Sequence, residues 1–159
     1  MLLASNTVRF LVAVLNAHMT FYHTTKTTAS PERIWQLWTG VANWPSWDTE
    51  LESAALEGNF TEGAKGTLKA VGSPRSTFII SACKPGSSYT FSTRLPLCQL
   101  HVTRRLTPLA AGTSFTHEVS FTGLLAPLFG RLLGRRYRQV LPQAMENLKQ
   151  QAEALSSVA

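Results

Sequence analysis

The sequence predicts an α+β domain in which a curved seven-stranded antiparallel sheet packs against one long C-terminal helix. Between residues 51 and 121, apolar and polar residues alternate in segments separated by turn residues roughly every ten positions, which is typical of an antiparallel meander. Residues 124–155 instead repeat apolar side chains every three or four positions, as a helix does. Because a long antiparallel sheet cannot leave its apolar face in water, we expect this helix to cover the sheet.

One strand and two short helices are predicted before the meander. Residues 20–29 are rich in threonine and aromatic residues, which favours a strand that Met19 opens. Ser30 is a good N-cap with Pro31 at the first helical position, and Gly40 ends this helix. A second short helix begins in the Trp-Pro-Ser-Trp turn at residues 44–47.

All four tryptophans of the chain lie within this helical region, at positions 35, 38, 44 and 47. Tryptophan has a large apolar area and one N–H group to satisfy, so the cluster indicates a heavily packed corner or the wall of a pocket. Trp38, Trp44 and Trp47 either wall the entrance of a cavity or plug the open end of the curved sheet. Asp48, which follows the turn, either caps the short helix or lines the mouth of the pocket.

The six strands of the meander follow one another without an intervening helix. Their predicted ranges are 51–56, 66–71, 77–83, 88–95, 97–106 and 113–121. Cys83 and Cys98 then lie on strands separated by a third strand, beyond disulfide reach. Two such cysteines indicate a reducing compartment, and we expect a cytoplasmic protein.

The C-terminal helix has one continuous apolar face. Its members are Phe129, Leu133, Tyr137, Val140, Ala144, Leu148, Ala152 and Leu155. Pro142 lies within the helix and predicts a kink near residues 138–141.

A single domain is expected over residues 19–157, because the chain has no internal repeat or linker. Residues 1–18 are interpreted as a leader or as the product of a start codon assigned too early, and we expect them to pack poorly. Their apolar run at residues 10–15 is too short to span a bilayer. It is also poorly formed as a signal peptide.

Four segments together resemble the START-like (SRPBCC) superfamily, which has the helix-grip fold. They are Ser-Pro-Glu-Arg-Ile-Trp at 30–35, Asn-Trp-Pro-Ser-Trp-Asp at 43–48, Gly-Asn-Phe-Thr-Glu-Gly-Ala-Lys-Gly at 58–66 and Gly-Thr-Ser-Phe-Thr-His-Glu-Val at 112–119. The segment at 123–134 looks like the bacterial polyketide cyclase/dehydrase-like branch. This resemblance implies a large cavity between the sheet and the C-terminal helix, as in lipid-transfer START domains and the birch pollen allergen. It does not settle the chemistry.

Two polar residues are expected on the apolar face of the last two strands. Alternation places Arg104 and His117 on that face, and a turn around residues 109–112 brings them opposite each other. Arg104 is then a candidate to hold an anionic or carbonyl oxygen, and His117 a candidate acid or base. The alternative is that Arg104 extends to water at the rim and His117 is a hydrogen-bonded core residue. Glu118 points to the opposite face and cannot work with His117 on one substrate.

The remaining ligand-binding candidates are aromatic and aliphatic residues on the same faces. They are Trp38, Trp44, Trp47, Tyr89, Phe91, Leu100, Val102, Phe115, Val119 and Tyr137. Tyr89 and Tyr137 could each offer a hydroxyl group to a ligand, although both serve equally well as core residues.

The chain is basic, with a formal net charge of +6 and a pI of about 9.8. Arg131, Arg135 and Arg138 recur at i, i+4 and i+7 on the C-terminal helix, opposite its apolar face. They form a solvated stripe or, alternatively, a surface for weak contact with an anionic membrane or an acidic partner. Nucleic acid is not expected as a partner, because the strands do not interleave aromatic and basic residues.

The leading functional hypothesis is therefore the binding of a hydrophobic small molecule (a lipid, a quinone or a polyketide-like compound) in an internal cavity. The sequence favours a binding protein over an enzyme, because it has no nucleophile elbow, phosphate loop or paired carboxylates. It also has no metal-ligand spacing or dinucleotide fingerprint, so no cofactor is expected. The alternatives are a cofactor-independent polyketide cyclase/dehydrase-like enzyme that uses His117, and a partner- or membrane-binding module that uses the basic helix.

Overall fold

The computed structural model describes residues 19–156, which form the predicted sheet and helices in the predicted order. The seven strands are β1 (Met19–Thr27), β2 (Leu51–Leu56), β3 (Lys65–Ala70), β4 (Arg75–Lys84), β5 (Ser88–Leu95), β6 (Cys98–Leu109) and β7 (Gly112–Thr122). They form one antiparallel sheet in the order β1-β7-β6-β5-β4-β3-β2. The expectations for residues 1–18 lie outside the described residues.

Two short helices follow β1 and lie at one end of the sheet. Helix α2 (Pro31–Thr39) begins where Ser30 Oγ accepts a hydrogen bond from the Arg33 N–H at 3.3 Å, as an N-cap does. Gly40 ends it, and the second short helix is the 3₁₀ helix η1 (Val41–Ser46). Helix α2 agrees with the prediction, whereas η1 begins directly after Gly40, before the predicted start in the turn at residues 44–47, and has the tighter 3₁₀ winding.

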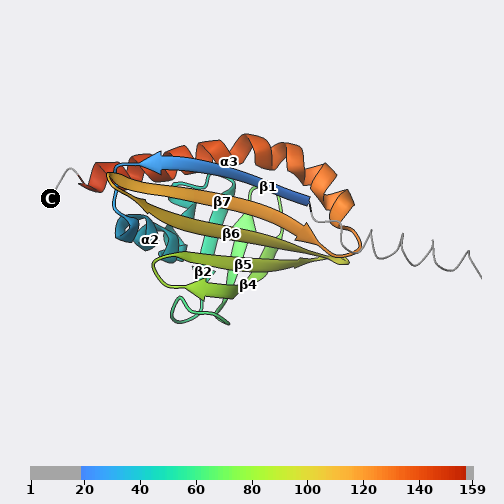
Figure 1. The fold of residues 1–159 in the computed structure, drawn as a ribbon. Helices are drawn as coiled ribbons and strands as arrows, with labels where there is room; N and C mark the ends of the chain where they lie inside the picture. Colours follow the sequence, from blue (N-terminus) through green and yellow to red (C-terminus); the bar gives the residue numbers. More distant parts are fainter. Residues whose placement is uncertain (1–18, 157–159) are drawn as a thin grey trace, which may run out of the picture.

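The long helix α3 (Ala126–Ser156) runs along the sheet and curves over it (Figure 1). It continues through Pro142 as one helix, so the proline does not end it. Two side chains of α3 fasten it to the short helices. Asn147 Nδ2 donates to the Trp47 carbonyl at 3.1 Å, and Gln151 Nε2 donates to the Ser46 carbonyl at 2.7 Å.

The N-terminal half of α3 approaches β1 closely because two glycines face that strand. An added Cβ at Gly134 would lie 2.3 Å from Phe21 Cζ, and one at Gly130 would lie 2.5 Å from Met19 Cβ. The Gly130-x-x-x-Gly134 spacing thus serves helix–strand packing inside the domain. Phe21 is buried, and the Arg138 guanidinium lies 5.1 Å from its ring centroid.

Replacing Gly134 by alanine is predicted to destabilise the protein by about 1–3 kcal/mol, because the buried Phe21 ring has to move. Gly130→Ala in the same helix should also destabilise the protein, because its added Cβ would meet Met19 Cβ, which moves only with the β1 backbone. Urea unfolding of the three proteins measures both effects. Helix propensity alone predicts the opposite sign, a gain of roughly 1 kcal/mol, so a stabilised Gly134→Ala variant would contradict the packing argument.

Candidate ligand-binding cavity

A cavity of about 420 Å³ lies between the concave face of the sheet and α3. Residues from β2 to β7 and from α3 line it, and most of these side chains are apolar. Its volume falls within the roughly 300–1,000 Å³ that is typical of small-molecule sites. The fold therefore leaves a ligand-sized space where sheet and helix separate.

Three buried tryptophans, Trp38, Trp44 and Trp47, together form the tryptophan corner, which fills the space between sheet and helices next to the cavity. Trp38, Trp44 and Trp47 are each fully buried, and Trp44 Nε1 donates to the Trp38 carbonyl at 2.8 Å. Trp38 packs edge-on against Phe115, and Trp44 stacks on Phe78 with ring centroids 5.6 Å apart. None of the three tryptophans lines the cavity. They close the space at one end as a plug, and the prediction that they wall the entrance is wrong for the cavity described here.

A row of polar side chains crosses the sheet beside this plug. Strand pairing places Tyr89 of β5 next to Arg104 of β6, Arg104 next to His117 of β7, and His117 next to His23 of β1. The predicted apposition of Arg104 and His117 is therefore confirmed. Both residues line the cavity at the end closed by the tryptophans, whereas Leu100 lies further along β6.

Arg104 is buried in an aromatic cage. Its guanidinium carbon lies 4.8 Å from the Trp44 ring centroid and 4.7 Å from that of Trp47. Tyr89 and Phe91 follow at 5.5 and 5.7 Å. Cation–π contacts of this kind partly replace the hydration that the charge has lost. The side chain does not extend to the rim, because it is only 2% exposed.

Two hydrogen-bonding positions of the polar pair are unused within the described residues. Arg104 Nη1 donates to the Tyr89 hydroxyl, but Arg104 Nε and His117 Nε2 have no hydrogen-bond partner. Burial, the Arg104 charge and His23 together lower the pKa of His117 well below 6.5, so its imidazole is neutral at pH 7. Burial also raises the pKa of Tyr89 to about 12, so its phenol is neutral. The alternative of a hydrogen-bonded core histidine therefore does not hold for Nε2.

Seven of the twelve predicted site residues line the cavity. They are Phe91, Leu100, Val102, Arg104, His117, Val119 and Tyr137. The other five, Trp38, Trp44, Trp47, Tyr89 and Phe115, are buried in the packed half of the interior. Tyr89 still touches the site through Arg104, and Trp38 and Trp47 do so through His117, at centroid distances of 5.6 and 5.8 Å.

The sequence analysis missed the wall that β2, β3 and the β3–β4 turn provide. It includes Leu51, Leu68, Ala70, Ser73, Pro74, Arg75 and Ser76. The pairing register shifts between Leu51 and Ser53, so simple alternation does not give the inward face of β2. The α3 side could have been predicted, because Leu133, Val140 and Ala144 belong to the apolar face read from the sequence.

Besides Arg104, the charged residues that line the cavity are Asp48, Glu50, Arg75 and Arg136. Asp48 lines the cavity, and its Oδ1 accepts a hydrogen bond from the Glu50 N–H at 3.2 Å. This hydrogen bond lies in the turn just before β2, so the carboxylate does not cap η1. Burial raises the pKa of Asp48, and the nearby charge of Arg104 partly opposes this shift. At the mouth, Arg136 Nε of α3 donates to Glu50 Oε2 at 2.6 Å and joins the two sides of the opening.

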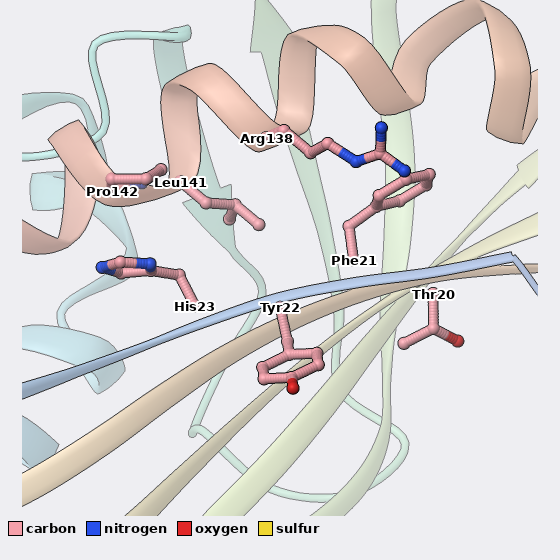
Figure 2. Close-up of a pocket in the computed structure, with 7 residues that line it drawn as sticks. All are labelled: Thr20, Phe21, Tyr22, His23, Arg138, Leu141 and Pro142. Carbon is pink, nitrogen blue, oxygen red and sulfur yellow. The ribbon is translucent and has the colours of Figure 1, made fainter.

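A second, smaller hollow of about 240 Å³ is lined by residues 20–23 of β1 and by Arg138, Leu141 and Pro142 of α3. Figure 2 shows Phe21 and His23 pointing from β1 toward α3, while Thr20 and Tyr22 point away. The Arg138 side chain covers the Phe21 ring there. This hollow contains no cluster of unpartnered polar atoms comparable with the Arg104–His117 pair.

The predicted basic stripe is exposed on the N-terminal half of α3. Arg131 and Arg135 lie beside the exposed Leu128 and Leu132, which are 51% and 69% exposed. Within residues 19–156, no helix is long and apolar enough to cross a membrane. The same residues contain no group of three or more histidines, cysteines or acids placed to hold a metal ion.

Comparison with known proteins agrees with this architecture, which is the helix-grip fold of the START-like class. A family model described as polyketide cyclase/dehydrase and lipid transport matches residues 18–153, so the chain belongs to this family. Among curated protein sequences, no significant match is found.

Three solved structures illustrate the shared fold. The di-domain ARO/CYC StfQ from the steffimycin biosynthetic pathway is 15% identical with a TM-score of 0.73; the match covers 98% of this chain but 61% of StfQ. Protein MLL2253 from Mesorhizobium loti is 22% identical with a TM-score of 0.67, over 82% of this chain and 94% of that one. A Thalictrum flavum norcoclaurine synthase mutant, bound to a transition-state analogue, is 10% identical with a TM-score of 0.68, over 88% and 97%. At these identities the likeness concerns the fold.

The neutral, buried His117 predicts that stability falls as the solution becomes acidic. Below the ordinary histidine pKa of 6.5 the unfolded chain binds a proton at this residue and the folded protein does not. The contribution of His117 to the unfolding free energy should therefore be fully present above about pH 7. Below that pH it should decrease by up to about 1.4 kcal/mol per pH unit. Urea unfolding at several pH values, compared with His117→Gln, measures this contribution. A His117 imidazole that NMR finds protonated near pH 6.5 would contradict the prediction.

Proposed function

We propose that this protein binds a hydrophobic small molecule, such as a lipid, a quinone or a polyketide-like compound, in the cavity between its sheet and α3. One observation carries the proposal: the cavity is apolar along its walls and has the polar pair Arg104 and His117 at its closed end. Apolar burial contributes roughly 25 cal/mol per Å² to binding, and a few convergent polar groups orient the ligand. The family's association with polyketide chemistry and lipid transport supports this reading.

Filling the cavity is expected to abolish binding while the fold persists. Val140 lines the cavity from α3 and is half-buried, so Val140→Phe should occupy part of the space. Fluorescence of the neutral dye Nile red reports cavity binding, and native mass spectrometry reports any molecule that copurifies. We expect Val140→Phe to weaken dye binding by about tenfold or more.

The matched control is Ile79→Phe, which adds the same side chain at an exposed position of β4 outside the cavity lining. This variant should bind Nile red as the unchanged protein does. Equal dye binding by all three proteins would show that the dye sits elsewhere, and an absence of any binding would defeat the proposal.

A cofactor-independent cyclase or dehydratase activity is the second candidate. The specific observation is that His117 is neutral, lies in the cavity wall and has an unpartnered Nε2, as a proton-transferring group requires. Arg104 beside it is placed to polarise a carbonyl oxygen. Confinement of a flexible poly-carbonyl chain in the cavity would supply proximity.

A test of this activity uses a synthetic poly-β-ketone thioester and follows its cyclised products by mass spectrometry. His117→Gln should reduce turnover by about 100-fold or more while leaving Nile red binding close to that of the unchanged protein. Turnover that survives the substitution would exclude His117 as the proton carrier. If the protein binds the thioester without converting it, the cyclase activity is excluded and the binding function still stands.

Contact with an anionic membrane or an acidic partner through Arg131, Arg135 and Arg138 stays a prediction. The neighbouring exposed leucines favour it, because a surface with both apolar and basic side chains suits a lipid interface. A cytoplasmic location also stays a prediction, which the free cysteines Cys83 and Cys98 support.

A further inference from the structure

The buried positive charge of Arg104 makes no ion pair with any residue of the described range 19–156. Arginine stays protonated throughout the pH range in which proteins are folded. Within residues 19–156, no carboxylate oxygen lies within the 4.0 Å of an ion pair with this guanidinium. The charge is 2% exposed, and aromatic faces and one neutral hydroxyl surround it.

Two neighbouring groups are uncharged, and the one acid that interacts with Arg104 electrostatically, Asp48, makes no ion pair with it. Tyr89 is held in its phenol form and His117 in its imidazole form, because burial shifts both pKa values away from the charged state. Asp48 lies near enough for an electrostatic interaction, but burial raises the pKa of this carboxyl and it makes no ion pair with Arg104. Cation–π contacts offset only part of the cost of burying a charge, and a hydrogen-bonded anion offsets more.

We propose that the ligand is a hydrophobic carboxylic acid whose carboxylate pairs with Arg104 at the closed end of the cavity. The Arg104 guanidinium in the cavity wall would supply the N–H donors beside His117, and the apolar body of the ligand would lie along Leu100, Val102 and Val119. This inference rests on the proposed function, since it names the ligand class of the same cavity. A neutral carbonyl would accept a hydrogen bond but leave the charge unbalanced. A dianionic phosphate would need more than this one buried cation.

The test compares three molecules that share a decyl chain and differ in the charge of the head group: decanoate, decanol and decyltrimethylammonium. Each is titrated against the full chain loaded with Nile red, below the concentration at which it forms micelles. We expect decanoate to displace the dye at a concentration at least about tenfold lower than decanol, and the cation to be the weakest of the three.

Arg104→Met keeps an unbranched side chain of similar length and removes the charge. It should weaken decanoate binding on the order of 30-fold and leave decanol binding within about twofold, so that the acid loses its advantage. The matched control is Arg105→Met, because Arg105 is exposed and pairs with Glu118 through Nη1 at 2.9 Å on the outer face. This control should preserve the preference for the acid.

The outcomes separate the inference from the function on which it rests. If neither Nile red nor any of the three molecules binds, the proposed function fails. If decanol binds as tightly as decanoate, or Arg104→Met keeps the preference for the acid, the cavity binds ligands but the carboxylate assignment is overturned. Should Arg104→Met not fold, the acid-to-alcohol ratio of the unchanged protein decides alone, and a ratio near one overturns the assignment.

Discussion

The packing of the tryptophan corner against the concave face of the sheet determines where this molecule can hold a ligand. Trp38, Trp44 and Trp47 fill the interior at one end, and α3 is fastened above them through Asn147 and Gln151. Further along, α3 and the sheet are lined by smaller aliphatic side chains, and the cavity of about 420 Å³ lies there. The space between the sheet and α3 is therefore filled where the large tryptophans lie and open where the smaller side chains lie.

The same rings explain how a charged residue is tolerated at the boundary between the filled and the open space. Arg104 lies with its guanidinium carbon within 5 Å of the Trp44 and Trp47 ring centroids, so the corner supplies both the closing wall and the electrostatic support of the cation. The support is incomplete, since Arg104 Nε and His117 Nε2 lack partners. Buried polar groups without partners are costly to the fold, because they have lost their hydrogen bonds to water.

The sequence predicted the fold and the polar pair because both follow from short-range rules. Alternation fixed the inward side of β6 and β7, and the tight turn at residues 109–112 fixed their register, so Arg104 and His117 could be placed opposite each other. The register shift between Leu51 and Ser53 defeats simple alternation in β2, so the inward side of that strand does not follow from the sequence. The tryptophans were misplaced for another reason: whether a large side chain lines a cavity or fills it depends on volumes that meet only in three dimensions.

Family membership and the shape of the cavity bear on different parts of the functional question. Relatives with the same fold include a synthase bound to a transition-state analogue and a protein from a polyketide pathway, so the shared architecture permits catalysis without requiring it. In this chain Arg104 and His117 line the cavity beside the tryptophans, and aliphatic side chains of β6, β7 and α3 make up much of the remaining wall. Under the proposed function, Arg104 and His117 would orient a ligand by its polar end, and only that end would meet them. Any reaction in this cavity would consequently act on the ligand's oxygen-bearing terminus, and the apolar remainder would contribute binding.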